Sequence, residues 1–234
     1  MSTRAGESPA VPTPAEVTGD LYQTRFSRSD QDRKRELWRV LCESFFQAYV
    51  GTDDAVVDLG AGFCEFINTI QCGQKFAVDL NPDTARYAAS DVRVIRTPSS
   101  QLDAFADNSV DVVFASNFFE HLPDKAQFVA TLQEIHRVLR SGSGRLLILQ
   151  PNIRLLNGEY WDFLDHHLPL TERTLIEAVQ LVGLSPVELR TRFLPYTTKS
   201  RLPQHRLLVR AYLAFRPFQW LFGKQTWLVA VKTR

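Results

Sequence analysis

Two predicted strands that each end in an acidic residue constrain the fold of this chain most strongly. The first strand, residues 55–59, carries Asp58 and runs into a turn that contains Gly60 and Gly62. A short helical stretch leads to the second strand, residues 75–79, whose last residue is Asp79. In a βαβ unit of this kind the glycines let the backbone approach a ligand, and the second acid accepts hydrogen bonds from ribose hydroxyls. The pattern therefore predicts a parallel sheet with a nucleoside site.

The residue at position 65 indicates which class of nucleoside this site can bind. A dinucleotide fingerprint places its third glycine there, where a helix N-terminus cradles a pyrophosphate. This chain has Glu65, whose carboxylate would repel a diphosphate. We therefore expect a nucleoside ligand without phosphates.

Strands and helices are predicted to alternate along the rest of the chain, which favours an α/β sheet covered on both faces. Asp124 and Gln127 resemble a capping box at the start of one helix. The strands are expected at residues 55–59, 75–79, 92–96, 110–115, 145–150, 187–193 and 225–232, and the helices at 29–50, 65–71, 83–89, 124–140, 172–182 and 204–222. We expect a flexible segment at residues 1–28 and one domain at 29–234, with a helical insert near 195–223.

Four sequence blocks resemble class I S-adenosylmethionine-dependent methyltransferases in their order and spacing. They are Val57-Asp-Leu-Gly-Ala-Gly, Ala77-Val-Asp-Leu-Asn, Asp111-Val-Val-Phe-Ala-Ser-Asn-Phe-Phe-Glu-His-Leu and Glu134-Ile-His-Arg-Val-Leu-Arg-Ser-Gly-Ser-Gly-Arg-Leu. The resemblance covers roughly residues 35–232. It implies a Rossmann-like, seven-stranded, mostly parallel sheet whose last strand is antiparallel, and S-adenosylmethionine as the cofactor.

The resemblance also implies roles for individual residues. The turn under the methionine part of the cofactor would be formed by Asp58, Gly60, Ala61 and Gly62. The ribose would be bound by Asp79, and the adenine would be contacted by Leu80, Gln101 and Leu102. Family members often carry an acid before this last pair, where this chain has Pro98-Ser99-Ser100, so a serine hydroxyl would have to replace it. Ser116 and Asn117 would lie beside the methionine and the sulfonium.

A second segment, residues 160–168, is expected to line the acceptor site. Methyl transfer is an in-line displacement, and a hydroxyl nucleophile also needs a base, for which histidine is suited near neutral pH. The segment offers His166 or His167 as the base, with Asp162 or Asp165 to orient it. Two alternatives stay open: a metal site of Asp165, His166 and His167, which adjacent ligands make weak, and simple packing of an aromatic loop. We therefore expect no metal. His121 is expected either to border the methyl donor or to be a structural residue.

Charge is distributed unevenly along the chain. All 26 acidic residues precede position 189, whereas the last 46 residues hold ten of the 27 Lys and Arg residues. A basic, apolar C-terminal segment favours an anionic partner such as a phosphorylated substrate or a membrane surface, although a solvated basic face is equally compatible. Residues 204–222 are predicted to form a helical segment with Arg206, Arg210 and Arg216 on one side, and Pro217 is expected to break it. This helix is interpreted as a lid, a dimer face or a peripheral membrane contact.

The cysteine content and the lengths of the apolar stretches indicate a cellular compartment for the protein, but they do not identify a partner. The three cysteines, at 42, 64 and 72, lack metal-ligand spacing and are expected to be reduced thiols of a cytoplasmic protein. No apolar stretch is long enough to span a membrane, and the N-terminus lacks a signal core. The oligomeric state is left open.

The most direct functional expectation is O-methylation of a sugar hydroxyl in a nucleotide-, lipid- or polysaccharide-linked acceptor. Segments 160–168 and 193–222 resemble bacterial methyltransferases associated with surface-polysaccharide biosynthesis. Alternatives are methylation of an isoprenoid or other small lipophilic molecule, and a catalytically silent cofactor-binding scaffold. Nucleic acid is not expected as a substrate, because an Asn-Pro-Pro-Tyr type motif is absent and the basic stretch is too apolar for a phosphate groove.

Overall fold

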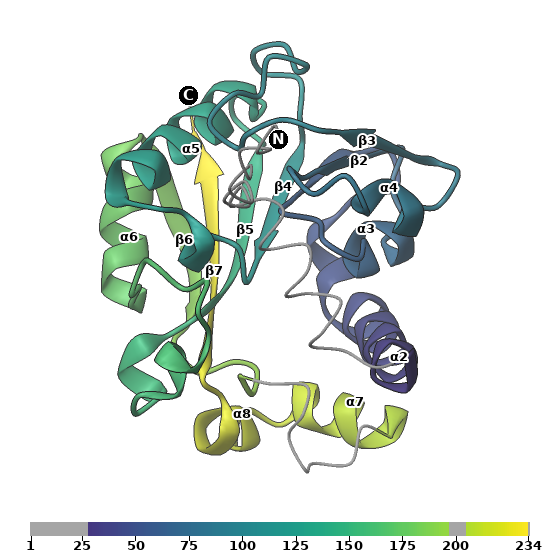
Figure 1. Ribbon diagram of the computed structural model, residues 1–234, viewed down its shortest axis with the longest axis vertical. Helices are drawn as coiled ribbons and strands as arrows, with labels where there is room; N and C mark the ends of the chain where they lie inside the picture. The colour runs from purple at the N-terminus through teal and green to yellow at the C-terminus, as the bar shows by residue number, and fades with distance from the viewer. Residues whose placement is uncertain (1–27, 197–204, 234) are drawn as a thin grey trace, which may run out of the picture.

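The computed structural model describes residues 28–196 and 205–233, and it forms one sheet of seven strands (Figure 1). The strand order is β3-β2-β1-β4-β5-β7-β6. Neighbouring strands from β3 to β5 are parallel, and β7 is antiparallel to both β5 and β6. The chain order reverses between β1 and β4, so the sheet has the topological switch point at which α/β proteins bind ligands. The expected Rossmann-like class with an antiparallel last strand is confirmed.

The strand bounds follow the predicted ones closely except at β6. This strand begins at Leu184 and ends at Arg190, earlier than the expected 187–193, because Gly183 already ends the preceding helix with a φ of +88°. Residue Val110 forms only an isolated bridge with Leu139, so β4 starts two residues later than predicted. The strands are β1 Ala55–Leu59, β2 Gln74–Val78, β3 Val92–Ile95, β4 Val112–Ser116, β5 Arg145–Pro151, β6 Leu184–Arg190 and β7 Gln225–Lys232.

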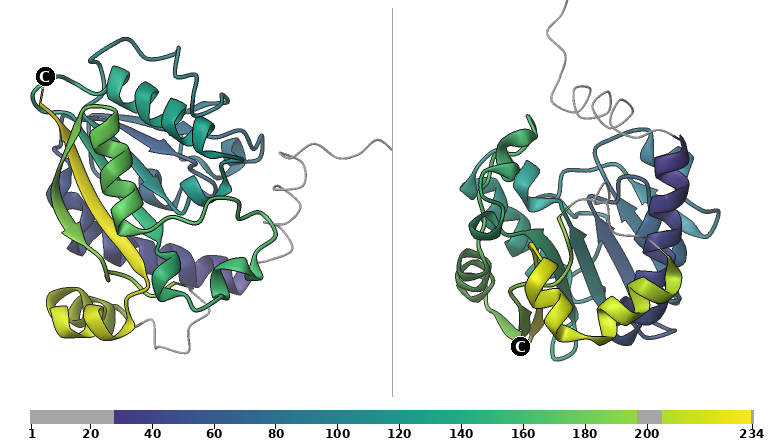
Figure 2. Two further views of the ribbon diagram at one scale, coloured as in Figure 1. Left: turned by 90° about the vertical axis from the view of Figure 1, so that its left-hand side faces the viewer. Right: turned by 90° about the horizontal axis from the view of Figure 1, so that it is seen from below.

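Helices cover both faces of the sheet (Figures 1 and 2). One face packs against α2 and α3, and the other against α5 and α6, as the two buried clusters show. The predicted cap of α5 is present, because the Asp124 carboxylate accepts a hydrogen bond of 2.8 Å from the Gln127 N–H. The helices are α2 Arg28–Ser44, α3 Glu65–Thr69, α4 Thr84–Tyr87, α5 Lys125–Val138, α6 Glu172–Leu181, α7 Arg206–Ala214 and α8 Arg216–Phe222, with short 3₁₀ turns at Phe46–Tyr49, Phe119–His121, Ile153–Leu155 and Glu159–Asp162.

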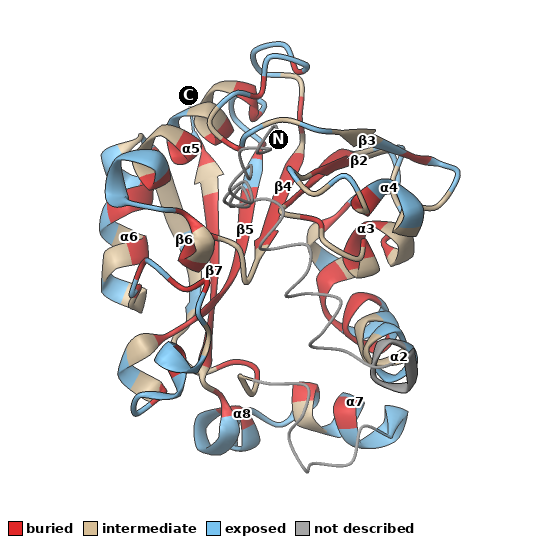
Figure 3. Cartoon of the chain, viewed as in Figure 1, coloured by how far each residue is buried: buried red, intermediate tan, exposed pale blue. Residues whose placement is uncertain are grey.

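The central strands are buried on both faces, which explains their continuous apolar runs (Figure 3). Alternate residues serve opposite faces. In β4, Val113 and Ala115 join the cluster beneath α5 and α6, whereas Val112 and Phe114 join the one beneath α2 and α3. Asp58 is the exception in this pattern, because it is a buried carboxylate within β1.

Aromatic rings that follow α2 pack against β4 and β7 of the sheet in tilted and edge-on arrangements. Trp227 of β7 is fully buried, and its ring centroid lies 5.3 Å from that of Phe46 and 5.3 Å from that of Phe45. Phe46 in turn lies 5.3 Å from Phe114 of β4. These contacts anchor the N-terminal helix to the last strand, so the two ends of the described chain stabilise one core.

The break at Pro217 that was predicted for the helical segment 204–222 is confirmed. Residues 197–204 lie outside the described part, and the remainder forms α7 and α8, separated at Phe215. Pro217 occupies the first turn of α8, where its missing N–H costs nothing, and it cannot continue α7. The predicted alignment of three arginines is wrong, however: Arg206 and Arg210 both pair with Glu43 of α2, whereas Arg216 belongs to the next helix.

Helix α7 packs along α2, far from α6 (Figure 2). No helix in the described residues is long and apolar enough to cross a membrane.

We predict that Trp227→Ala lowers the free energy of unfolding by about 3–5 kcal/mol, because it empties the centre of the aromatic cluster. Trp220→Ala provides the matched control, since Trp220 is 72% exposed and Trp227 is 0% exposed. Urea titration of both variants gives the measurement. Equal stability losses would contradict the assignment of Trp227 to the core.

Candidate cofactor and acceptor site

The glycine turn after β1 has the geometry that close ligand approach requires. Gly60 and Gly62 adopt φ angles of +72° and +51°, which disfavour other residues. A Cβ added at Gly62 would meet no atom within 4 Å, so space lies above the backbone there. A Cβ at Gly60 would come within 2.3 Å of the Phe118 ring, which packs on this turn. Two residues after Gly62, the backbone of Cys64 is also left-handed, with a φ of 58°.

Asp79 directly follows the last residue of β2, and its side chain reaches the glycine turn. Its carboxylate accepts hydrogen bonds from the N–H groups of Gly62, at 2.7 Å, and Asn81, at 2.8 Å. Burial raises the pKa of the Asp79 carboxyl, and these N–H groups together with nearby His121 oppose that rise. A carboxylate has about four acceptor positions, so Asp79 keeps capacity for the two hydroxyls of a ribose.

A second acid lies beneath the turn. Burial raises the pKa of the Asp58 carboxyl well above its usual range, and the charges of Glu65 and Asp79 raise it further. Glu65 itself, at the first position of α3, pairs with Lys34 of α2 at 3.0 Å. The repulsion of a pyrophosphate by Glu65 stays a prediction, because Lys34 pairs with this carboxylate.

The predicted adenine contacts differ in what they offer a ligand. Leu80 is 48% exposed directly after Asp79, and Gln101 is exposed as well. Leu102 is fully buried, and its side chain belongs to the core beneath α5. Ser99 does not supply a free hydroxyl, because its Oγ lies 2.7 Å from that of buried Thr131.

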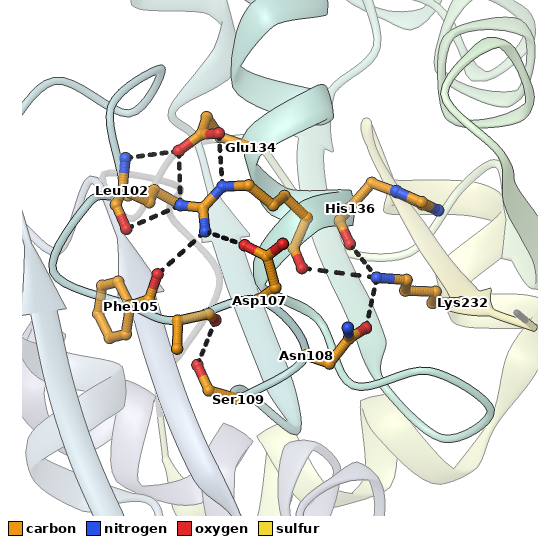
Figure 4. A network of polar contacts seen from close by, with 10 residues as sticks. Leu102, Phe105, Asp107, Asn108, Ser109, Glu134, His136 and Lys232 are labelled. Atoms are coloured by element: carbon orange, nitrogen blue, oxygen red, sulfur yellow. Dashed lines mark hydrogen bonds and ion pairs between the residues drawn. The ribbon is translucent and has the colours of Figure 1, made fainter.

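A polar network holds the loop that carries Gln101 and Leu102 (Figure 4). The Arg137 guanidinium donates to the carbonyl oxygens of Leu102 and Phe105, both at 3.0 Å, and pairs with Asp107 at 2.7 Å. Glu134 completes the network by accepting the Leu102 N–H at 2.8 Å. Helix α5 thus fixes the position of this loop, which accounts for the Glu134–Arg137 spacing in the sequence.

The end of β4 contributes the next part of the site. Asn117 has a left-handed φ of 48°, and its N–H donates to the Leu149 carbonyl of β5 at 2.8 Å. Its side-chain amide donates to the Ser116 hydroxyl at 3.0 Å. Ser116 ends β4 and Asn117 follows it, at the same edge as the glycine turn, since β1 and β4 are parallel neighbours.

Immediately beyond lies a cluster of ionisable side chains, which we call the Glu120–His166 cluster; it comprises Glu120, His121, Asp165 and His166. The His121 Nδ1 lies 2.9 Å from the Asp165 carbonyl oxygen and 3.3 Å from its carboxylate. The His166 Nδ1 lies 2.9 Å from the Tyr160 carbonyl, and the two imidazole centroids are 5.1 Å apart. Residues distant in sequence therefore meet at the edge formed by β4 and β5.

The structure separates the two histidines that the sequence offered as bases. His166 is buried within the cluster, whereas His167 is exposed and only its backbone N–H is held, by the Glu120 carbonyl at 2.7 Å. The Asp165 carboxylate lies 3.3 Å from the Nδ1 of His121. Asp162 is exposed on the turn Glu159–Asp162.

Two residues of this cluster region were not identified from the sequence. Glu120 is 1% exposed and accepts a hydrogen bond of 2.9 Å from the amide of Gln150, which lies on β5. Burial raises the pKa of the Glu120 carboxyl, and His121 opposes that rise. The available signal was positional: Glu120 follows β4 and Gln150 ends β5, so adjacent parallel strands bring them to one edge.

A family model matches the part of the chain that contains the glycine turn and Asp79. Residues 57–148 match the family model described as a methyltransferase domain. Comparison with curated protein sequences gives no match. The matched segment runs from the glycine turn to β5, and so includes the predicted cofactor residues.

Solved structures show the same fold at low sequence identity. A methyltransferase from Haloferax volcanii, solved in complex with the activator Trm112, aligns with a TM-score of 0.64 at 20% identity, over 92% of this chain and 96% of that one. A SAM-dependent methyltransferase from Archaeoglobus fulgidus gives 0.62 at 19%, over 84% and 93%. A possible histamine N-methyltransferase from Thermotoga maritima gives 0.64 at 13%, over 94% and 100%.

Residues 57–148 thus match a methyltransferase domain, and the chain shares its fold with solved S-adenosylmethionine-dependent methyltransferases, which together imply S-adenosylmethionine as the cofactor.

Proposed function

We propose that this methyltransferase transfers the methyl group to a hydroxyl of a small molecule or glycan, most simply a sugar hydroxyl in a nucleotide-, lipid- or polysaccharide-linked acceptor. The observation that carries the proposal is the position of the Glu120–His166 cluster. Glu120 and His121 closely follow Ser116 and Asn117 in the chain, and Asp165 contacts His121, so we place the cluster beside the proposed sulfonium end of the cofactor. His121 also opposes the rise in the pKa of the Asp79 carboxyl, which supports placing the cluster near the proposed ribose site.

The proposed chemistry requires collinear geometry and one proton acceptor. The acceptor oxygen attacks the methyl carbon, the carbon–sulfur bond breaks, and S-adenosylhomocysteine leaves. The hydroxyl proton must pass to a base, and we propose His166 or His167 for this role. Asp165 contributes by fixing His121, and through it the shape of the cluster.

Aromatic residues near the cluster fit a sugar acceptor. Trp161 is 56% exposed and offers a face on which a sugar ring can stack. Tyr160 is fully buried, and its hydroxyl donates to the Leu168 carbonyl, so it shapes the segment instead of contacting the acceptor. Glu159, in the same short 3₁₀ turn as Trp161, forms an ion pair with Lys224.

We predict that Asp79→Asn weakens S-adenosylhomocysteine binding by about 10- to 100-fold, because a neutral amide replaces the charged acceptor of the ribose hydroxyls. Isothermal titration calorimetry gives the dissociation constants. Asp91→Asn is the matched control, since Asp91 pairs with Lys75 at the opposite end of β2. Equal affinities of both variants and the parent chain would contradict the assignment of Asp79.

We predict that methyl-labelled S-adenosylmethionine, incubated with the chain and an extract of the source cells, gives an alkali-stable methyl ether in the carbohydrate fraction. The double variant His166→Ala/His167→Ala should lose about 10²- to 10⁴-fold in rate with cofactor affinity unchanged. An unchanged rate would contradict a histidine base. Alkali-labile label would indicate an ester, and cofactor binding without any transfer would favour the silent scaffold.

A second candidate, methylation of an isoprenoid or other lipophilic molecule at a membrane surface, is favoured by a different observation. Helices α7 and α8 expose many large apolar side chains, and no acidic residue follows position 188. Such a surface fits the interface of an anionic membrane. The exposed side chains are Leu207, Leu208, Phe215, Phe218, Trp220, Leu221 and Phe222.

We predict that, in this second case, the chain co-sediments with vesicles of mixed phosphatidylcholine and phosphatidylglycerol. The variant Trp220→Ser/Leu221→Ser should bind several-fold more weakly, because two exposed apolar contacts are lost. Leu181→Ser/Val187→Ser, which alters exposed apolar residues on α6 and β6, is the control. A parent chain that stays in the supernatant would contradict the membrane contact.

A further inference from the structure

We propose that Glu120, His121 and His166 bind one divalent transition-metal ion of the zinc class. These three residues come from two separate segments, the turn after β4 and the segment after β5. Each offers one ligand atom, and the three atoms lie within 4.8 Å of one another. A set of two histidines and one glutamate is a known zinc-binding combination, and it leaves a coordination position open for a substrate or water.

The contacts of both imidazoles resemble those of metal ligands. A histidine that binds a metal almost always donates its other ring N–H to a carboxylate or a backbone carbonyl. His121 has its Nδ1 2.9 Å from the Asp165 carbonyl, and His166 has its Nδ1 2.9 Å from that of Tyr160. Hydrogen bonding at Nδ1 places the proton there, which leaves each Nε2 as the nitrogen able to bind a metal.

The carboxylate of Glu120, the third proposed ligand, is also held in place by a hydrogen bond. Glu120 is almost fully buried, and the Gln150 amide donates to one of its oxygens at 2.9 Å. Its backbone carbonyl accepts the N–H groups of His167 and Leu168, which binds the second segment to the first. Removing a carboxylate from water is costly, and a bound cation compensates that cost directly.

An independent observation lies around the cluster. Within the described residues, two buried polar atoms close to it have no hydrogen-bond partner: the Gln150 Oε1 and the Tyr196 hydroxyl oxygen. Gln150 contacts Glu120, and Tyr196 packs edge-on against Phe163, whose ring stacks on His166 at 5.0 Å. Buried polar atoms without partners are rare in proteins, and a hydrated metal ion would supply partners here.

The donor set selects the class of ion. Two imidazole nitrogens and one carboxylate suit borderline ions such as Zn²⁺, Co²⁺ or Fe²⁺, whereas Mg²⁺ and Ca²⁺ prefer oxygen ligands alone. The thiols do not offer a competing site of this kind. Cys42 and Cys64 are buried, and burial raises the pKa of both, which disfavours the thiolate that a metal needs.

A metal at this position would deepen the proposed function, on which this consequence rests. An acceptor hydroxyl bound to the ion loses its proton more easily, because the cation stabilises the alkoxide. The proton would pass to exposed His167 or to water, the alkoxide oxygen would bond to the methyl carbon, and the carbon–sulfur bond would break. This predicts acceptors that can offer the ion an oxygen, such as a sugar with neighbouring hydroxyls.

The test is zinc binding by the tag-free chain after treatment with a chelator. We expect one Zn²⁺ per chain by elemental analysis and calorimetry, with no competition from equimolar Mg²⁺ or Ca²⁺. The variants Glu120→Gln and His166→Gln should each weaken binding by at least about 10-fold. His167→Gln, altered at the adjacent exposed histidine, should retain the parent affinity.

Binding of S-adenosylhomocysteine by each variant shows that it is folded, and His121→Gln repeats the test at a less buried ligand. A stripped chain that binds no Zn²⁺, or Zn²⁺ binding that survives all three ligand substitutions, would overturn the metal site. Zinc binding without any S-adenosylhomocysteine binding would instead contradict the proposed function alone. Co²⁺ substitution adds a spectroscopic check, because nitrogen and oxygen ligands lack the thiolate charge-transfer band.

Discussion

The whole proposed site depends on the parallel register of β1, β2, β4 and β5. Parallel strands end at one edge of a sheet, so the residues that follow each strand are brought together. That edge holds Asp79 after β2, the glycine turn after β1, and Glu120 after β4. Burial of these acids is unfavourable without partners, and the backbone N–H groups of Gly62 and Asn81 are the partners that Asp79 receives. The fold therefore creates a site that favours polar ligands at one edge.

The sequence allowed the sheet and the cofactor half of the site to be predicted, because these depend on local patterns. A β-branched run, two glycines and an acid at a strand end specify the turn and Asp79 without distant information. The break in the 204–222 segment could also be predicted, because Pro217 cannot continue a helix. The ion pairs of Arg206 and Arg210 with Glu43 of α2 could not be predicted, since they depend on the packing of α7 against α2.

The acceptor half was predicted only in part, since its geometry comes from tertiary contacts. His166 and His167 are adjacent in the sequence, but which of them is buried depends on tertiary contacts such as the Glu120 carbonyl that accepts the N–H groups of His167 and Leu168. Glu120 and Gln150 gained significance only once β4 and β5 were known to be neighbours. Which rings meet across 45 residues of sequence could not be read from spacing alone.

The central claim is that the methyl donor points toward the Glu120–His166 cluster. A crystal structure of the chain with S-adenosylhomocysteine tests it most directly. The account predicts ribose hydroxyls on Asp79, methionine above Gly60–Gly62, and the sulfur atom facing His121 and His166. A sulfur atom directed away from these rings, or a ribose bound elsewhere than Asp79, would contradict it.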